Sequence, residues 1–182
     1  MDKALLVIDY TVDFVAEDGK LTCGEPGIVL EEYIASLAEQ FVQEKQFVVM
    51  PVDVHDENDP YHPETKSFPP HNIRGTSGRD LYGRLKDVYE QHKEHIHWMD
   101  KTRFSAFAGT DLEILLRARN IKEIHLVGVC TDICILHTAV DAYNKGFDIV
   151  IHEGGVASFN ETGHAWALTH FENTLGAKVI KK

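Results

Sequence analysis

The sequence predicts an α/β fold: one three-layer α/β/α domain spanning residues 1–182, with a mainly parallel, doubly wound sheet of about six strands. Short apolar runs rich in β-branched residues alternate with amphipathic stretches, the pattern of βαβ units. Several runs are almost continuously apolar, as strands buried on both faces of a parallel sheet should be. The chain length and the apolar fraction of 43% suit a single globular domain.

The first half of the chain contains two predicted strands and one helix. KALLVID (3–9) and QFVVMPVD (46–53) are apolar runs that each end in an acid. Between them, residues 28–45 carry apolar side chains at helical spacing. Residues 55–78 hold four of the six prolines and predict a long irregular loop, which in a compact domain is usually functional.

The second half alternates strand and helix more regularly. HIHWMD (95–100), EIHLVGV (123–129), FDIVIH (147–152) and AKVIK (177–181) are the predicted strands. The predicted helices are 110–120, which begins at an N-cap-like threonine, 131–146, which ends at a glycine, and 164–177. On the last helix we expect Trp166 and Phe171 to face the core.

Charge and composition exclude several classes of function. A formal net charge of −11 argues against binding to nucleic acid. No apolar run is long enough to span a bilayer, and the first residues lack the features of a secretory signal. Three cysteines are too few for a disulfide framework. We therefore expect a cytoplasmic protein with no nucleic-acid or membrane partner.

Polar residues follow four of the predicted strands. Asp9 ends the first, Asp53 and His55 the second, Lys101 follows the third, and the segment 130–134 follows the fourth. The carboxyl ends of parallel strands share one edge of the sheet, where ligands bind. Taken singly, the acid could cap a turn, the lysine could be a surface charge and the cysteines could be core residues. Together they predict an active site.

Cys134 is the better nucleophile of the two thiols in GVCTDICILHTAVDA (128–142). It lies in the first turn of a predicted helix, where unpaired backbone N–H groups and the helix dipole favour an anion and lower a thiol's pKa. The same N–H groups could stabilise an oxyanion. A disulfide between Cys130 and Cys134 is geometrically poor.

The long loop offers a second signal, a set of metal-ligating side chains. Asp53 and His55 are followed by His62, Glu64 and His71. Two imidazoles and a carboxylate suit zinc, iron or manganese and leave positions open for water or substrate. The alternative is a polar loop with incidental histidines. Aromatic residues near these positions could wall a flat substrate, although core packing is the alternative for each: Phe14, Phe68 and Phe104.

These segments resemble the isochorismatase-like cysteine hydrolases, and within them the nicotinamidases, which hydrolyse nicotinamide to nicotinate and ammonia. ALLVIDYTVDF, DKTRFSAFAGTDL and GVCTDICILHTAVDA match the family's acid, lysine and nucleophile segments, and PVDVHDENDPYHPE with FPPHNIRGTSG matches its metal loop. The resemblance implies the family's fold over nearly the whole chain and a small-molecule amide as substrate. It also makes a homo-oligomer plausible.

The resemblance also implies a role for each residue. Asp9 would be the general base, Lys101 would keep the site charged, and Cys134 would form a thioester with the substrate. The backbone N–H groups of Cys130 and Cys134 would form the oxyanion hole, with a cis peptide at Val129–Cys130.

One divalent metal ion, zinc most simply and otherwise iron or manganese, would hold the pyridine nitrogen of the substrate. Its ligands would be Asp53, His55, His71 and either His62 or Glu64, of which we favour Glu64. The aromatic residues would sandwich the ring: Phe14, Phe68 and Phe104.

Two departures and two alternatives stay open. Position 130 is often alanine in relatives, and Phe68 and Phe104 replace tryptophan or tyrosine in some, so the preferred amide could differ. The same fold could instead hydrolyse another small amide, a carbamoyl compound or isochorismate. A thiol redox sensor or a metal-binding protein is the non-hydrolytic alternative.

Overall fold

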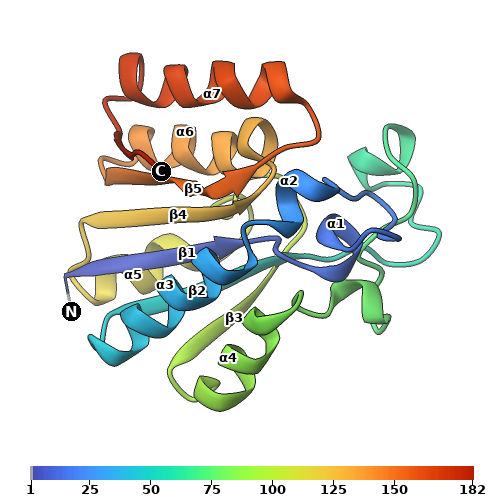
Figure 1. Ribbon diagram of the computed structural model, residues 1–182, viewed down its shortest axis with the longest axis horizontal. Helices are drawn as coiled ribbons and strands as arrows, with labels where there is room; N and C mark the ends of the chain where they lie inside the picture. Colours follow the sequence, from blue (N-terminus) through green and yellow to red (C-terminus); the bar gives the residue numbers. More distant parts are fainter. Residues whose placement is uncertain (1) are drawn as a thin grey trace.

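The computed structural model describes residues 2–182, which form a six-stranded parallel sheet in the order β3-β2-β1-β4-β5-β6 (Figure 1). Every neighbouring pair of strands in this sheet is parallel. The strands are β1 (Lys3–Ile8), β2 (Phe47–Asp53), β3 (Ile96–Lys101), β4 (Glu123–Val129), β5 (Asp148–Ala157) and β6 (Lys178–Ile180).

Helices connect the strands and cover both faces of the sheet (Figure 1). They are α1 (Val12–Val15), α2 (Glu25–Ile28), α3 (Glu31–Gln43), α4 (Arg84–His92), α5 (Leu112–Ala118), α6 (Leu136–Asn144) and α7 (Glu161–Asn173). Two short 3₁₀ turns, Pro63–Lys66 and Ser77–Arg79, lie between β2 and α4, and a π-helical turn, Thr131–Ile135, precedes α6.

The two faces of the sheet bury two separate hydrophobic cores. Successive side chains of a strand point to opposite faces, so Leu6 and Ile8 of β1 pack in the core under α5, α6 and α7. Leu5 and Val7 pack in the other core, under α3 and α4. Strands buried on both sides need apolar residues at every position, which explains the continuous apolar runs in the sequence.

The predicted α/β fold and its six strands are confirmed, and the differences are local. Strand β5 continues five residues past the predicted end at 152, through two glycines to Ala157. Helix α4 was not predicted, and the helix expected at 131–146 begins with the π-helical turn. Phe171 is buried as expected, but the prediction for Trp166 was wrong: its side chain is 54% exposed and stacks on His170.

The strand order determines where a site can form. The connections lead from β1 outward on one side through β2 to β3, and on the other from β4 to β6, so the order reverses between β1 and β4. A crevice opens at the carboxyl ends of such a pair. The two strands approach so closely there that a Cβ at Gly128 (φ +116°) would lie 1.9 Å from the carbonyl oxygen of Ile8. Among residues 2–182, no helix has the length and apolar character needed to cross a membrane.

Candidate active site

Asp9 and Lys101 form a buried ion pair at the crevice. Asp9 directly follows β1 with φ +56°, a left-handed conformation that aspartate tolerates better than most residues. Its Oδ2 lies 2.8 Å from Lys101 Nζ, and its Oδ1 accepts a hydrogen bond of 2.8 Å from the backbone N–H of Asp53. Both side chains are sealed from solvent. Among the described residues, Asp9 Oδ2 has no hydrogen-bond partner beyond this ion pair, so it can accept a proton.

Cys134 lies beside the same lysine. Lys101 Nζ is 3.7 Å from Cys134 Sγ and also donates to the carbonyl oxygen of Arg103 at 3.1 Å. The thiol is carried by the π-helical turn after β4, a type of turn that is frequent at functional sites. Acid, lysine and thiol therefore meet as the strand ends predicted.

The ionisable groups of this cluster change one another's pKa. Burial raises the pKa of Asp9, and the Lys101 ammonium offsets this only in part. Burial lowers the pKa of Lys101, but the neighbouring acidic groups, led by Asp9, outweigh it and hold the lysine charged.

The predicted lowering of the Cys134 pKa was wrong. Burial raises the pKa of this thiol well above its usual range, despite the nearby lysine. The sequence reasoning counted the helix terminus and omitted the desolvation of a thiol that is 7% exposed. The resting nucleophile is thus a neutral thiol that needs a base, and Asp9 is a suitable one.

The chain turns sharply between β4 and the thiol. The Val129–Cys130 peptide bond is cis, as the resemblance implied. The backbone N–H groups of Ile133 and Ile135 both donate to the carbonyl oxygen of Cys130, at 3.1 and 3.2 Å. These two hydrogen bonds close the turn that carries Cys134.

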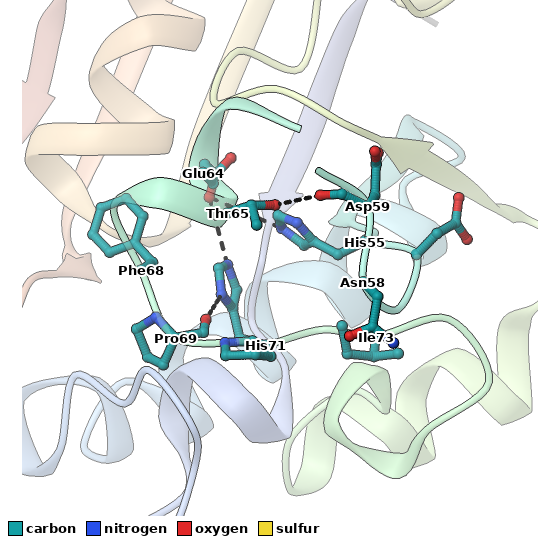
Figure 2. Close-up of a pocket in the computed structure, with 11 residues that line it drawn as sticks. His55, Asn58, Asp59, Glu64, Thr65, Phe68, Pro69, His71 and Ile73 are labelled. Atoms are coloured by element: carbon teal, nitrogen blue, oxygen red, sulfur yellow. Dashed lines mark hydrogen bonds and ion pairs between the residues drawn. The ribbon is translucent and has the colours of Figure 1, made fainter. Parts of the chain in front are cut away.

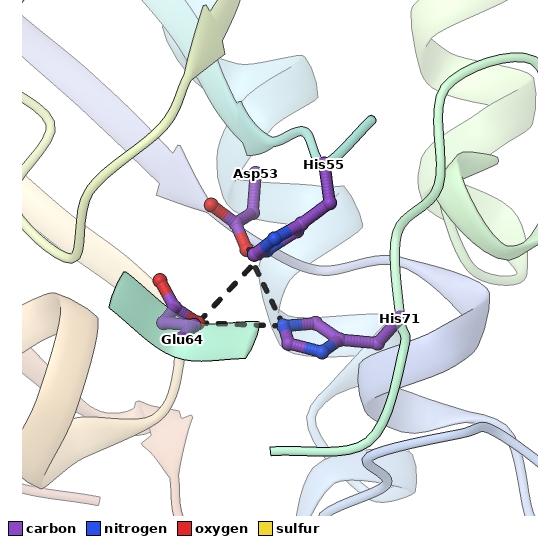
Figure 3. A group of neighbouring side chains, drawn as sticks. All are labelled: Asp53, His55, Glu64 and His71. Carbon is purple, nitrogen blue, oxygen red and sulfur yellow. Dashed lines mark hydrogen bonds and ion pairs between the residues drawn. The ribbon is translucent and has the colours of Figure 1, made fainter. Parts of the chain in front are cut away.

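Four predicted metal ligands converge next to this cluster (Figure 3). One nitrogen or oxygen atom from each of them lies within 4.8 Å of the other three, and all four side chains are buried: Asp53, His55, Glu64 and His71. Asp53 ends β2 and Glu64 comes from the Pro63–Lys66 turn. The Oδ1 of Asp53 lies 3.4 Å from Lys101 Nζ, so the two clusters share a carboxylate.

The donor set fits a divalent cation. Burial lowers the pKa of His71, but the carboxylates of Asp53 and Glu64, each with an oxygen 3.5 Å from His71 Nε2, outweigh it and raise the value to about 10, so this cluster favours a positive charge. Among the described residues, no group makes a regular hydrogen bond to this buried Nε2. Its Nδ1 donates to the carbonyl oxygen of Pro69 at 2.7 Å, which leaves Nε2 free as a ligand (Figure 2).

His62, the alternative to Glu64, points elsewhere. Its Nε2 donates to the carbonyl oxygen of Thr102 at 2.9 Å, and its Nδ1 accepts from the backbone N–H of Glu64 at 3.2 Å. Both ring nitrogens are therefore occupied, and the ring caps the turn that carries Glu64. The preference for Glu64 stays a prediction that this geometry supports.

A pocket with an empty volume of about 310 Å³ joins the thiol to the metal cluster. All three predicted aromatic residues line it, together with Asp53, Glu64 and Cys134. The sequence analysis assigned Cys130, which also lines the pocket, a role only through its backbone, and it missed three further lining side chains: Leu21, Ile133 and Phe159. Ile133 could have been found, because it directly precedes the nucleophile. Phe159 follows β5, and the early end assigned to that strand hid its position at the same sheet edge.

Two buried contacts hold the metal loop. Asp13 of α1 accepts a hydrogen bond from the backbone N–H of Asn72 at 2.8 Å, next to His71. A Cβ at Gly78 would lie 2.1 Å from the Asp13 carboxylate, so only glycine fits there. Arg79 donates to the carbonyl oxygen of Asp53 at 2.9 Å. These contacts hold the loop in place although its backbone is irregular.

A thiol, a buried acid and a lysine at the carboxyl edge of a parallel sheet are the groups that a cysteine hydrolase requires. The chain belongs to the isochorismatase family: the Isochorismatase domain matches residues 3–182.

Known proteins are similar to this chain in sequence and in fold over nearly its whole length. The isochorismatase family protein PncA of Bacillus subtilis is 64% identical over 183 residues, which cover 100% of both chains. The crystal structure of nicotinamidase/pyrazinamidase PncA from Bacillus subtilis superposes with a TM-score of 0.97 at 61% identity, covering 98% of this chain and 99% of that one. The crystal structure of pyrazinamidase of Pyrococcus horikoshii in complex with zinc superposes with a TM-score of 0.87, at 25% identity and with full coverage of both chains.

Proposed function

We propose that the protein is a metal-dependent nicotinamidase, which hydrolyses nicotinamide to nicotinate and ammonia through a thioester on Cys134. The observation that carries the proposal is the pocket itself. It brings together a nucleophilic thiol, three aromatic rings and two carboxylates of a metal-ligand cluster. Aromatic walls with a few convergent polar groups suit a small aromatic amide. The similarity to nicotinamidase/pyrazinamidase PncA supports the same substrate.

The first half of the reaction starts with Asp9. Its Oδ2, which is paired with Lys101, takes the Cys134 proton, and the Lys101 ammonium, 3.7 Å from the sulfur, stabilises the thiolate that results. The sulfur attacks the amide carbon. The backbone N–H groups of Cys130 and Cys134 donate hydrogen bonds to the developing oxyanion. Asp9 then returns the proton to the amide nitrogen, so that ammonia leaves and a thioester remains.

The second half regenerates the enzyme. Asp9, again ionised, takes a proton from a water molecule that attacks the thioester carbon. The acid product leaves and the thiolate recovers the proton. Throughout, Phe14, Phe68 and Phe104 hold the ring and exclude bulk water from the reacting carbon.

Asp53, His55, Glu64 and His71 would hold the divalent ion, and we propose zinc, given the nitrogen and oxygen donors and the zinc complex of the Pyrococcus horikoshii relative. When bound, the ion supplies a Lewis acid for the pyridine nitrogen and so orients the ring. Isochorismate, one of the alternative substrates, has no ring nitrogen to use such an ion. The cytoplasmic location and the homo-oligomer stay predictions.

The test is an ammonia-release assay on nicotinamide with and without a chelator. We expect turnover that falls on chelation, survives in Cys130→Ala and disappears in Cys134→Ala. Turnover in Cys134→Ala but not in Cys130→Ala would contradict the assigned nucleophile. Metal-free protein with full activity would contradict the role of the ion, and activity only on other amides would contradict the substrate.

A further inference from the structure

A second sulfur lies next to Cys130, and it belongs to neither the nucleophile nor the metal cluster. Cys23 and Cys130 are 107 residues apart in the chain, yet their Sγ atoms are 3.2 Å apart. Each residue is a free cysteine and only 5% exposed. A disulfide bond is about 2.05 Å long, so the two sulfurs need to approach by roughly 1 Å.

We propose that Cys23 and Cys130 are an oxidative modification site, in which a small hydroperoxide converts the thiol pair into a disulfide that joins two walls of the substrate pocket. One wall is the turn after β4, because Cys130 lines the pocket. The other is the segment after α1: Leu21 lines the pocket, and the backbone N–H of Cys23 donates to the carbonyl oxygen of Phe14 at 2.8 Å.

The pocket gives an oxidant access to this pair. Cys130 shares the pocket with Cys134, so a molecule small enough to reach the nucleophile also reaches Cys130. Cys134 itself contacts the Lys101 ammonium, whereas the partner of the Cys130 sulfur is Cys23. The hydrogen bond with Cys23 and burial raise the pKa of Cys130, so little thiolate is present and the oxidation should be slow.

The chemistry balances with the peroxide as the only oxidant. A cysteine sulfur attacks one peroxide oxygen, the O–O bond breaks, and a sulfenic acid forms together with one water from hydrogen peroxide, or one alcohol from an organic hydroperoxide. The second thiol attacks the sulfenic sulfur, the S–O bond breaks, and a water leaves with the thiol proton. Two thiols lose two electrons to the peroxide, and a dithiol reductant reverses the change.

The cross-link should slow the enzyme. It pulls Cys130 toward Cys23, and the backbone N–H of Cys130 is one of the two proposed oxyanion donors. Loss of one such donor costs about 10²–10³ in kcat, so the cross-linked protein should retain at most about a tenth of its activity. This consequence rests on the proposed function, whereas formation of the disulfide does not.

The modification is tested first without the nucleophile. The reduced full-length Cys134→Ala variant is treated with excess hydrogen peroxide, alkylated while denatured and mapped by mass spectrometry without reduction. We expect a loss of two hydrogens and a linked peptide pair containing Cys23 and Cys130, both reversed by dithiothreitol. Adding Cys23→Ala should abolish the linked pair. Two cysteines that remain alkylatable, or that end as unlinked sulfinic acids, would overturn the proposal.

Activity is measured next, in protein with Cys134 intact. Nicotinamide turnover should fall in step with the cross-linked fraction, and Cys23→Ala should keep more of its activity under the same exposure. A cross-link with unchanged turnover would overturn the predicted effect on the enzyme. If untreated protein has no nicotinamide activity, the proposed function fails instead, and the peptide map still decides the modification.

Discussion

At the scale of single residues, the central feature is a buried acid that shares one lysine with a thiol. Asp9 is fully buried, and Lys101 is 1% exposed. Isolated charges at such depth would be unstable, so each depends on the other. The same lysine also contacts Asp53 at 3.4 Å and thereby links the proposed base to the metal cluster. A substitution at any of these positions should therefore affect both activity and stability.

Asp9→Asn tests the base with little change in shape. The amide oxygen can still accept the hydrogen bond from the Asp53 N–H, which keeps the end of β1 in place. The variant cannot take the thiol proton, so kcat should fall about 10²–10⁴-fold while the circular dichroism spectrum is retained. Asp18→Asn, an exposed acid on the following segment, is the matched control and should leave kcat unchanged. Comparable kcat values in the two variants would exclude Asp9 as the base.

Glu64→Gln and His62→Gln test the fourth metal ligand. Glu64 contributes a carboxylate to the cluster, whereas both ring nitrogens of His62 are bonded elsewhere. Glu64→Gln should lower the zinc affinity at least about tenfold, and His62→Gln should lower it less. Competition with a chromophoric chelator gives both affinities. The opposite ranking would make His62 the ligand.

At the scale of elements, the strand ends were predictable and the connections were not. Parallel strands share a carboxyl edge, so Asp9, Asp53 and Lys101 could be grouped from their positions alone. Helix α4 was missed because only Leu85 and Val88 of its nine residues are buried, too few for a clear helical period.

Two other features depend on packing that the sequence does not encode locally. No local pattern brings Cys23 to within 3.2 Å of Cys130. The prediction for Trp166 is also wrong. Its near-helical spacing from Phe171 predicts a buried side chain, whereas the side chain faces solvent.

Helix α1 is only four residues long, yet it supports the metal loop through Asp13. Asp13→Ala would leave the buried N–H of Asn72 without its acceptor and loosen His71 next to it. We expect a metal affinity about 10–100-fold lower, measured by the same chelator competition, with the sheet unaffected in hydrogen exchange. Glu17→Ala, exposed two residues after this helix, should change neither quantity. An unchanged affinity in Asp13→Ala would show that the loop holds its shape without α1.

At the scale of the whole molecule, a chain of hydrogen bonds through two buried histidines links neighbouring strands away from the active site, and we call this chain the histidine relay. Tyr33 of α3 donates to His152 Nδ1 at 2.9 Å, His152 Nε2 lies 2.8 Å from His125 Nδ1, and His125 Nε2 lies 2.9 Å from a Glu123 carboxylate oxygen. One direction of donation satisfies every atom: Tyr33 to His152, His152 to His125, and His125 to Glu123. In this arrangement both imidazoles are neutral, and the relay joins β4, β5 and α3.

The relay predicts a loss of stability in mild acid. Burial, and then repulsion from the charge that His125 carries when it is protonated, lower the pKa of His152 to about 4, from an ordinary value of 6.5. Between these two values the unfolded chain binds the proton and the folded chain does not. The free energy of unfolding therefore falls as the pH drops from about 6.5 to about 4. The loss should be on the order of 2 kcal/mol, less than the full shift implies because the site is not completely sealed.

Urea unfolding of wild type and His152→Gln between pH 7.5 and 4.5 measures this loss. Groups remote from the relay titrate equally in both proteins, so the difference in the free energy of unfolding reports on His152 and its hydrogen-bonded neighbour His125. Glutamine can still accept from Tyr33 and donate to His125, and it does not titrate. The advantage of the wild type over the variant should therefore shrink steadily as the pH falls. His95→Gln, at an exposed histidine, should keep the wild-type slope. A difference independent of pH would mean that His152 contributes packing and hydrogen bonds but no proton linkage.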